Sequence, residues 1–150
     1  MAKTILKAAI SAVIIFILDR LIKLLFLDGS TWHSEVLSLY LVLNKGVAFS
    51  MFAFLGEWLK YIQIVIITAL LVFVYREKLF FTQNAIAVGM LFGAGCGNIL
   101  DRFLYGGVVD YIAWHYGFNF AVFNFADVAI NFGVFLIIVK MAWKKRGNEV

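Results

Sequence analysis

Two aspartates in the C-terminal part of the sequence stand without a basic residue beside them. Asp110 lies in the stretch GGVVDY and Asp127 in NFADVAI, each close to the end of an apolar segment. Two carboxyl groups held close together cannot easily both ionise, so one pKa rises and the pair shares a proton. One member can then activate a water molecule while the other donates a proton, which is chemistry suited to hydrolysis of an amide. An ion or proton relay and a purely structural role remain open for the same pair.

Other polar residues gather near the same ends of the apolar segments, at helical spacings. Asp19 and Lys23 are four residues apart, which favours an ion pair that stabilises the structure. Asp101 and Arg102 favour a buried pair or network that fixes helix geometry. Asn124, Asp127 and Asn131 are spaced three and four residues apart, which predicts a polar stripe on one helical face. The amides of Asn98 and Asn131 can contact either another helix or a substrate.

The composition indicates an integral membrane protein that is made of a single domain, residues 1–150. The chain has 150 residues, of which 64% are hydrophobic and 15% charged, and it contains no proline. A soluble domain is usually about 45–50% apolar. The net charge of +4 is therefore no sign of nucleic-acid binding, because in a membrane protein the position of each charge relative to the spans matters more.

Four segments are apolar enough over about 20 residues to cross a bilayer as helices. They are residues 5–27, 58–75, 84–104 and 125–143. Glycines recur every fourth residue in the third segment, which predicts close packing of that helix against another: they are Gly89, Gly93 and Gly97.

The basic residues in the connections and at the ends of the chain predict the orientation of these spans. Those before the first segment, between the second and third, and at the end of the fourth are Lys3, Lys7, Arg76, Lys78, Lys140, Lys144, Lys145 and Arg146, whereas the connections on the opposite side contain Lys45 and Lys60 alone. Cytoplasmic loops carry an excess of lysine and arginine. We therefore expect both termini in the cytoplasm, and the long connections 28–57 and 105–124 on the outer side.

The two outer connections are rich in β-branched and aromatic residues and partly alternate. EVLSLYLVLNKGVAFSMF predicts extended structure, with a hairpin turning near residues 44–46, and GVVDYIAWHYGFNFAVFNF has the same character. The expected fold class is thus an all-α membrane protein of four spans, with a small β platform on the periplasmic side.

Three other functions are weighed against a carboxylate dyad. A serine–lysine protease would need Ser50 with Lys45 or Lys23, and a zinc site would need more ligands than His33, His115 and Cys96 supply. A small ion or solute transporter could use intramembrane Asp and Arg. Its polar residues should extend across the membrane, however, whereas here they cluster at one end.

The stretches GNILDRFLYGGVVDY and FNFADVAINFG, with LNKGVAFSMF upstream, resemble lipoprotein signal peptidase, the type II signal peptidase family of bacteria. The resemblance covers nearly the whole chain. It implies an intramembrane aspartyl protease that cleaves diacylglyceryl-modified prolipoproteins just before the lipidated cysteine, with Asp110 and Asp127 as the catalytic pair. The supporting positions that it implies are Asp19, Lys23, Asn44, Gly46, Asn98, Asp101, Arg102, Asn124 and Ala126.

The resemblance also implies the setting of the enzyme. This is the bacterial cytoplasmic (inner) membrane, with the site near the periplasmic face, membrane lipid around it, and globomycin-type inhibitors occupying the site. No feature demands a cofactor, and a monomer is the simplest expectation. Two departures from the family are Arg20, where glutamine is frequent, and residues 120–124, where many members have a proline. Which aspartate acts as base and which as acid stays open.

Overall fold

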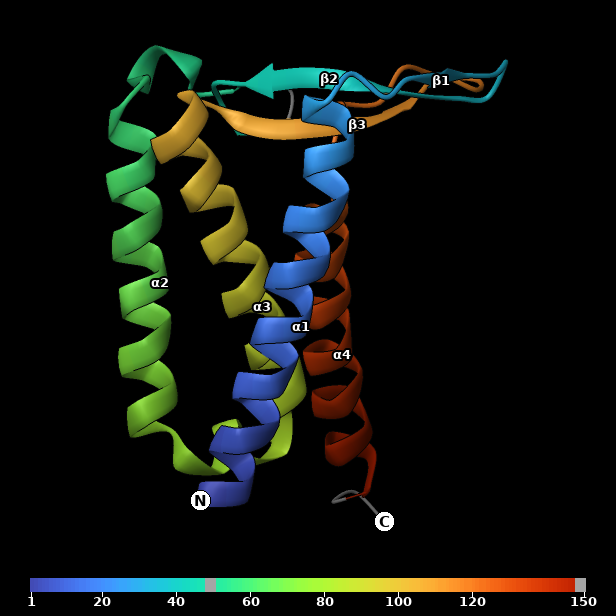
Figure 1. The fold of residues 1–150 in the computed structure, drawn as a ribbon. Helices are drawn as coiled ribbons and strands as arrows, with labels where there is room; N and C mark the ends of the chain where they lie inside the picture. The colour runs from blue at the N-terminus through green and yellow to red at the C-terminus, as the bar shows by residue number, and fades with distance from the viewer. Residues whose placement is uncertain (48–50, 148–150) are drawn as a thin grey trace.

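The computed structural model describes residues 1–47 and 51–147 and is mostly helical (Figure 1). A small antiparallel sheet lies across one end of the helices, which confirms the expected combination of helices with a β platform. The helices are α1 (Ala2–Leu27), α2 (Trp58–Arg76), α3 (Lys78–Tyr105) and α4 (Phe125–Gly147), with a 3₁₀ turn, η2 (Ala53–Leu55), before α2.

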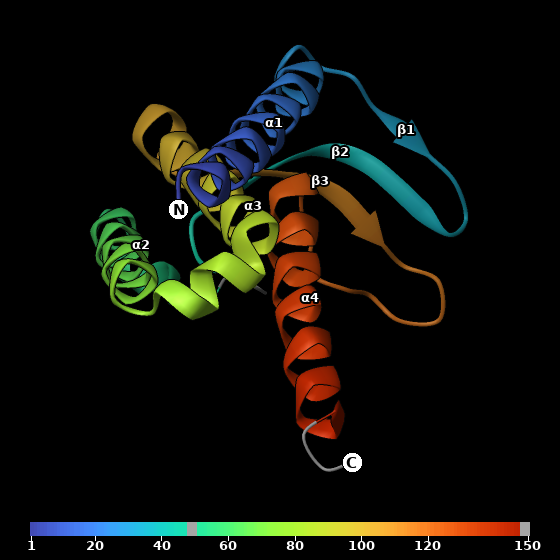
Figure 2. The ribbon, with the colours of Figure 1, turned by 90° about the horizontal axis from the view of Figure 1, so that it is seen from below.

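Helix α3 is the centre of the bundle and packs against α1, α2 and α4 (Figure 2). Its closest approach is to α1, where a Cβ added at Gly89 or Gly93 would overlap the backbone carbonyl of Ala8 or Ala12, respectively. A Cβ at Gly97 would overlap the carboxylate of Asp19. The glycine pattern thus marks the α1–α3 contact, as predicted.

Helix α3 begins at Lys78, earlier than the expected start at residue 84. Asn84 has non-helical dihedral angles (φ −120°, ψ 19°) and marks a kink, across which the helix continues. Its side chain turns back to donate a hydrogen bond to the Phe80 carbonyl at 2.9 Å. Only Glu77 separates α2 from α3, so the predicted boundary corresponds to the kink.

Three helical stretches in the described part of the chain are long and apolar enough to cross a membrane. They are Trp58–Arg76, Lys78–Tyr105 and Phe125–Lys144, and they make the chain a multi-pass membrane protein by length and composition. Helix α1 has 26 residues but carries five charged ones: Lys3, Lys7, Asp19, Arg20 and Lys23. The start of α1 and the end of α4 lie at the end of the bundle opposite the sheet (Figure 1).

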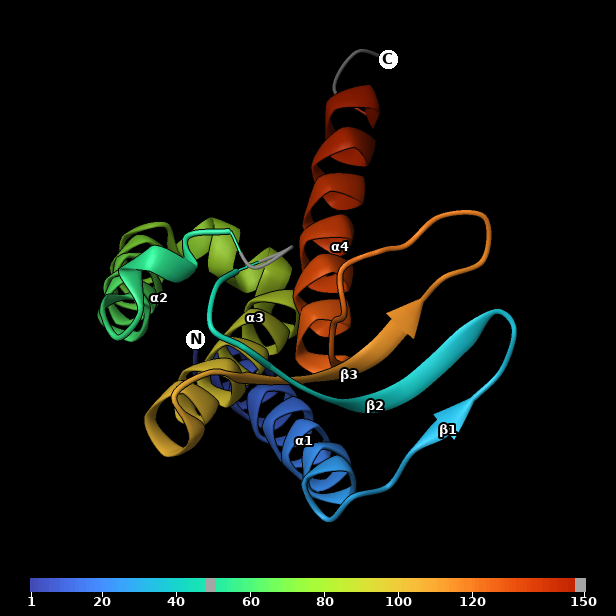
Figure 3. The same cartoon turned by 90° about the horizontal axis from the view of Figure 1, so that it is seen from above.

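The sheet has the order β1 (Trp32–His33), β2 (Leu37–Asn44), β3 (Val108–Trp114). Seen from above, it passes across α1 and the start of α4 and extends sideways beyond them (Figure 3). The β2–β3 register pairs Val42 with Asp110 and Asn44 with Val108. These two pairings bring the end of β2 beside the catalytic candidate on β3.

The predicted hairpin turn at residues 44–46 is wrong. Strand β2 ends at Asn44 and forms its hairpin on the other side, with β1, while β3 pairs with its second edge. The Asn44 side chain accepts a hydrogen bond from the Gly46 backbone N–H at 2.9 Å and donates one to the Val47 carbonyl at 3.2 Å. This local turn directs the chain toward η2 and α2 instead of a return strand.

Candidate active site

Asp110 is buried at the third position of β3 and is held by two amide side chains. Asn44 Nδ2 donates to its Oδ2 at 2.9 Å, and Asn124 Nδ2 donates to its Oδ1 at 2.7 Å. Asn44 reaches it because side chains two residues apart share one face of a sheet, and Val42 is the direct partner of Asp110. No charged side chain pairs directly with this carboxyl group among the described residues.

Asp127 lies in the first turn of α4, where Asn124 forms a reciprocal cap. The Asp127 N–H donates to Asn124 Oδ1 at 2.9 Å, and the Asn124 N–H donates to Asp127 Oδ2 at 3.1 Å. This is the geometry of a capping box, in which each side chain satisfies a backbone donor of the other residue. Asn98 Nδ2 donates to the remaining oxygen, Asp127 Oδ1, at 3.0 Å.

Asn124 therefore joins the two aspartates. Its backbone and its Oδ1 cap Asp127, while its Nδ2 binds both Asp110 Oδ1 and, at 3.2 Å, Asn98 Oδ1. The residue is fully buried, so these bonds are not exchanged for water. The sequence spacing of Asn124 and Asp127 predicted a shared helical face but not this bridge.

The pKa of Asp110 is raised from 3.8 to about 7. Burial is the main cause, and the nearby charge of Asp127 adds to the rise. The hydrogen bonds from Asn44 and Asn124 and the charge of Lys23 act in the opposite direction. Asp110 therefore exchanges its proton near neutral pH, which suits an acid–base role.

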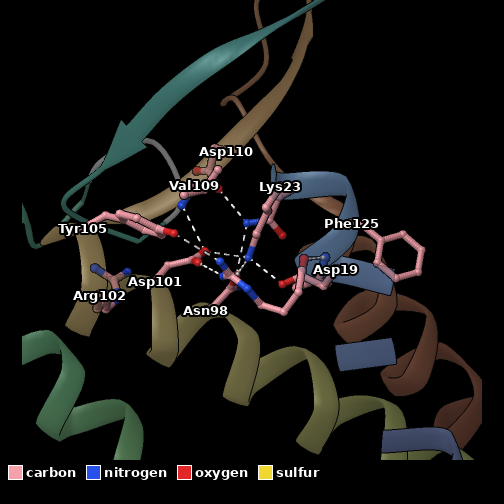
Figure 4. A network of polar contacts seen from close by, with 12 residues as sticks. Asp19, Lys23, Asn98, Asp101, Arg102, Tyr105, Val109, Asp110 and Phe125 are labelled. Atoms are coloured by element: carbon pink, nitrogen blue, oxygen red, sulfur yellow. Dashed lines mark hydrogen bonds and ion pairs between the residues drawn. The ribbon is translucent and has the colours of Figure 1, made fainter. Parts of the chain in front are cut away.

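A second cluster of charges lies next to this pair, between α1 and α3 (Figure 4). Lys23 Nζ is 2.7 Å from both Asp19 Oδ2 and Asp101 Oδ2, and all three side chains are fully buried. Arg20 forms a further ion pair with Asp101 Oδ1 and lies near the Tyr105 hydroxyl. The expected Asp19–Lys23 ion pair is thus present, within a larger network.

The buried pair or network expected at Asp101 and Arg102 is a network, and the two side chains do not pair with each other, because successive helical residues point in different directions. Asp101 is paired with Arg20 and Lys23 instead. Arg102 donates to Gln63 Oε1 at 2.9 Å and to the Gly46 carbonyl oxygen, and so connects α3 with α2 and with the turn after β2.

The charge cluster is bonded to both candidate catalytic residues through the backbone and through Asn98. Asp101 Oδ2 accepts the N–H of Val109, the neighbour of Asp110, at 3.2 Å. Lys23 Nζ donates to Asn98 Oδ1 at 2.8 Å, and Asn98 in turn holds Asp127. Asp19 Oδ1 accepts the N–H of Ala126 at 3.2 Å, which fixes the start of α4 against α1.

A cavity of about 470 Å³ opens beside the two aspartates. Its polar wall contains Asn44, Gly46, Gln63, Asn98, Arg102, Asp110, Asp127 and Asn131, and its apolar wall contains Val47, Val108, Phe120, Ala121, Val122, Phe123, Val128 and Ile130. Gln63 and the loop 120–123 also line the cavity, although the sequence pattern predicts neither as part of a site. An amide inside the apolar second span was the available signal for Gln63.

The two histidines weighed for a zinc site contact residues of the sheet and not the two aspartates. His115 Nε2 forms a hydrogen bond of 3.0 Å with Ser38 Oγ, and the His33 ring stacks on Tyr40. Within residues 1–47 and 51–147 no three His, Cys, Asp or Glu side chains are grouped as metal ligands. Ser50 lies outside the described residues.

Comparison with known proteins decides the family. A family model described as signal peptidase (SPase) II matches residues 11–143. The chain belongs to the signal peptidase II family. The expected enzyme class, an aspartic signal peptidase, is thereby confirmed, and the transporter alternative finds no support.

Curated relatives of this family cover most of the chain, and each is named lipoprotein signal peptidase. The protein of Wolinella succinogenes is 51% identical over 89% of this chain and 92% of its own length. That of Helicobacter pylori strain 26695 is 48% identical, over 91% of this chain and 88% of its own.

Solved structures of two bacterial membrane enzymes share the fold. One, at 2.3 Å resolution, has a TM-score of 0.78 and 27% identity, and covers 95% of this chain and 91% of its own. The other, at 1.9 Å, has a TM-score of 0.74 and 29% identity, over 89% and 91% of the two chains.

Proposed function

We propose that this signal peptidase II removes the signal peptide from diacylglyceryl-modified prolipoproteins, cutting before the lipidated cysteine, with Asp110 and Asp127 as its catalytic pair. The name shared by the curated relatives supports the substrate class. The observation that carries the residue assignment is the Asn124 bridge, which holds both carboxyl groups at the wall of one cavity.

In the proposed mechanism the two aspartates share one proton and bind a water molecule between them. The ionised carboxylate takes a proton from the water as the water oxygen attacks the scissile carbonyl. The protonated carboxyl group gives its proton to the carbonyl oxygen. Collapse of the tetrahedral intermediate then breaks the C–N bond, and the amine leaves with a proton from the pair.

The neighbouring residues position this reaction. Arg102 and Asn44 lie on the cavity wall and are suited to hold the peptide backbone of the substrate, because the guanidinium and amide groups supply N–H donors. Asn124 is fully buried, so its part is to hold the two aspartates. The buried residues next to the pair hold it in position through the hydrogen bonds and ion pairs described above. They are Asp19, Lys23, Asn98 and Asp101. Two backbone groups add to this framework: the Gly46 carbonyl accepts a hydrogen bond from Arg102, and the Ala126 N–H donates one to Asp19.

We further propose that α1 is a fourth span and that residues 1–150 form one domain with both termini in the cytoplasm. The sheet and the cavity then face the periplasm at the outer surface of the inner membrane. The charges of α1 support this placement, since Lys3 and Lys7 precede the apolar part and Asp19, Arg20 and Lys23 lie in the buried network or against it. The protein acts as a monomer among membrane lipids, and globomycin-type inhibitors occupy the same cavity.

The first experiment is cleavage of a diacylglyceryl-modified prolipoprotein in detergent by wild type, Asp110→Asn and Asp127→Asn. Both variants should lose at least about 10³-fold in kcat while remaining folded, because an amide cannot exchange the shared proton. Asp28→Asn, an exposed aspartate after α1, is the matched control and should cleave like wild type. Activity retained in either dyad variant would exclude the proposed pair.

The orientation is tested by labelling spheroplasts, whose inner membrane is intact, with a membrane-impermeant thiol reagent. In a Cys96→Ala background, Glu35→Cys should be labelled and Glu77→Cys should be protected, since the two positions lie on opposite sides of the membrane in the proposed topology. The reverse pattern would place the site in the cytoplasm.

A further inference from the structure

Asn131 lies on the wall of the cavity, one helical turn further along α4 than Asp127. Residues four apart project from the same face of a helix, with about 6 Å between them along its axis. Helix α4 starts beneath the sheet and runs toward the opposite end of the bundle (Figure 1). Asn131 therefore lines the same cavity as Asp127, but deeper in the span.

Asn131 differs from the other polar side chains on this wall. Within the described residues, Asn44, Gln63, Asn98, Arg102 and both aspartates each have a hydrogen-bond partner. Asn131 is exposed and forms no hydrogen bond to any described residue. Its amide thus presents two N–H donors and a carbonyl acceptor to whatever fills the cavity.

An unpaired amide is costly at this depth. Between Asp127 and Lys140, Asn131 is the one polar side chain in a run of apolar residues, and this run belongs to a candidate span. Transfer of an amide into hydrocarbon is unfavourable unless a partner satisfies it. The neighbouring wall residues on α4, Val128 and Ile130, are apolar and offer this amide no side-chain partner.

We propose that Asn131 binds a carbonyl oxygen of the lipopeptide substrate, one helical turn deeper than the scissile bond. This inference rests on the proposed function, because it assumes that the lipopeptide enters this cavity. Two parts of such a substrate carry carbonyl oxygens at membrane depth: the peptide backbone before the cysteine, and the esters of the diacylglyceryl group. A hydrogen bond to either one would increase the affinity of the cavity for the substrate.

The test is steady-state cleavage of a diacylglyceryl lipopeptide by wild type, Asn131→Leu and Asn131→Gln. Loss of one neutral hydrogen bond corresponds to about a tenfold rise in KM, and kcat should stay unchanged because Asn131 does not touch the reacting atoms. Asn131→Gln keeps the amide and should recover at least part of the affinity. Phe132→Leu, an adjacent exposed residue outside the cavity wall, should leave KM unchanged.

A second substrate, with ether-linked chains in place of esters, identifies the carbonyl. If Asn131→Leu still raises KM on the ether substrate, the carbonyl belongs to the peptide. If Asn131→Leu and wild type have equal KM values on the ether substrate, the carbonyl belongs to the ester. Either result supports the proposal.

Equal KM values for wild type and Asn131→Leu on the ester substrate would overturn the inference, as would the same rise in Phe132→Leu. Asn131→Ser provides a second variant if the leucine variant is poorly folded. A wild type that leaves both substrates intact would instead contradict the proposed function itself.

Discussion

Four carboxylates lie close together in this protein, and they form two pairs with different partners. Asp19 and Asp101 face the cations Lys23 and Arg20. Asp110 and Asp127 face the neutral amides of Asn44, Asn98 and Asn124. All of the first pair's charge is matched by cations, whereas the second pair is held only by hydrogen bonds to groups without charge.

This difference in partners suggests different roles for the two pairs. A buried carboxylate that is paired with a cation holds two elements together, because removing either partner leaves an uncompensated buried charge. A carboxyl group held by amide donors in a buried place gains or loses a proton at much lower cost, and burial accordingly raises the pKa of Asp110 to about 7. We infer that the charged pair fixes the helices, while the amide-held pair is left free to exchange protons.

The largest effect that tests this comparison is expected from Lys23→Met. The change leaves Asp19 without its cation and removes one of the two cations at Asp101, in a place with no exposure to water. Breaking a buried ion pair by removing one partner costs about 3–5 kcal/mol. Chemical unfolding in detergent should show this loss, whereas Lys3→Met, an exposed lysine on the same helix, should change stability by less than about 0.5 kcal/mol.

A Lys23→Met protein as stable as wild type would show that the cluster is not a structural ion network. The two pairs of carboxylates would then not differ in the way described. Activity measured on the same sample would show whether Asn98, which accepts from Lys23, still holds Asp127.

The outlines of the fold could be predicted from the sequence because they depend on local composition. Apolar runs give the helices to within a few residues, and the glycine spacing indicates the tight face of α3. The predicted start of the third helix, residue 84, is a kink within α3 in the structure. Composition does not reveal it, because a helix that continues past a non-helical residue looks the same in the sequence as a helix that begins there.

The partners within the site could not be predicted, because they join residues distant in the chain. Spacing indicates that Asp101 and Arg102, as successive residues of one helix, point in different directions, but not which residues each of them contacts. Arg20 and Gln63, the partners that they find, lie on two other helices. The hairpin was assigned to the wrong side of β2 for the same reason, since the local NKG signal competes with pairing to a strand some 65 residues away.

A smaller effect is expected from the pH dependence of stability at Asp110. A carboxyl group whose pKa is raised by folding binds its proton more tightly in the folded state. Its contribution is therefore present at low pH and is lost as the pH rises from 3.8 through about 7. Asp110→Asn does not titrate, so wild type should lose about 2 kcal/mol relative to this variant between pH 5 and pH 7.

The measurement is urea or thermal unfolding of both proteins at pH 5, 6 and 7 in one detergent. Asp28→Asn, which replaces an exposed aspartate outside the site, is measured at the same three pH values as the control. A constant difference between wild type and Asp110→Asn would mean that Asp110 is ionised throughout. In that case the contrast between a pair that exchanges protons and a pair that fixes the helices would not hold for Asp110.

The smallest effect is expected from Arg20→Gln, at the position where this chain departs from the family pattern. Arg20 is the outermost member of the charged pair's network, with 15% of its side chain exposed, and Lys23 remains beside Asp101 when Arg20 is lost. A partly solvated ion pair contributes about 1 kcal/mol or less, so we expect a small loss of stability and nearly unchanged kcat. Arg76→Gln, an exposed arginine at the end of α2, is the matched control.

A different result would follow if Arg20→Gln lowered the free energy of unfolding as much as Lys23→Met. Asp101 would then be stabilised mainly by its ion pair with Arg20. The network would then be centred on the residue that is least buried, and the division between a structural and a catalytic pair would have to be redrawn around Arg20.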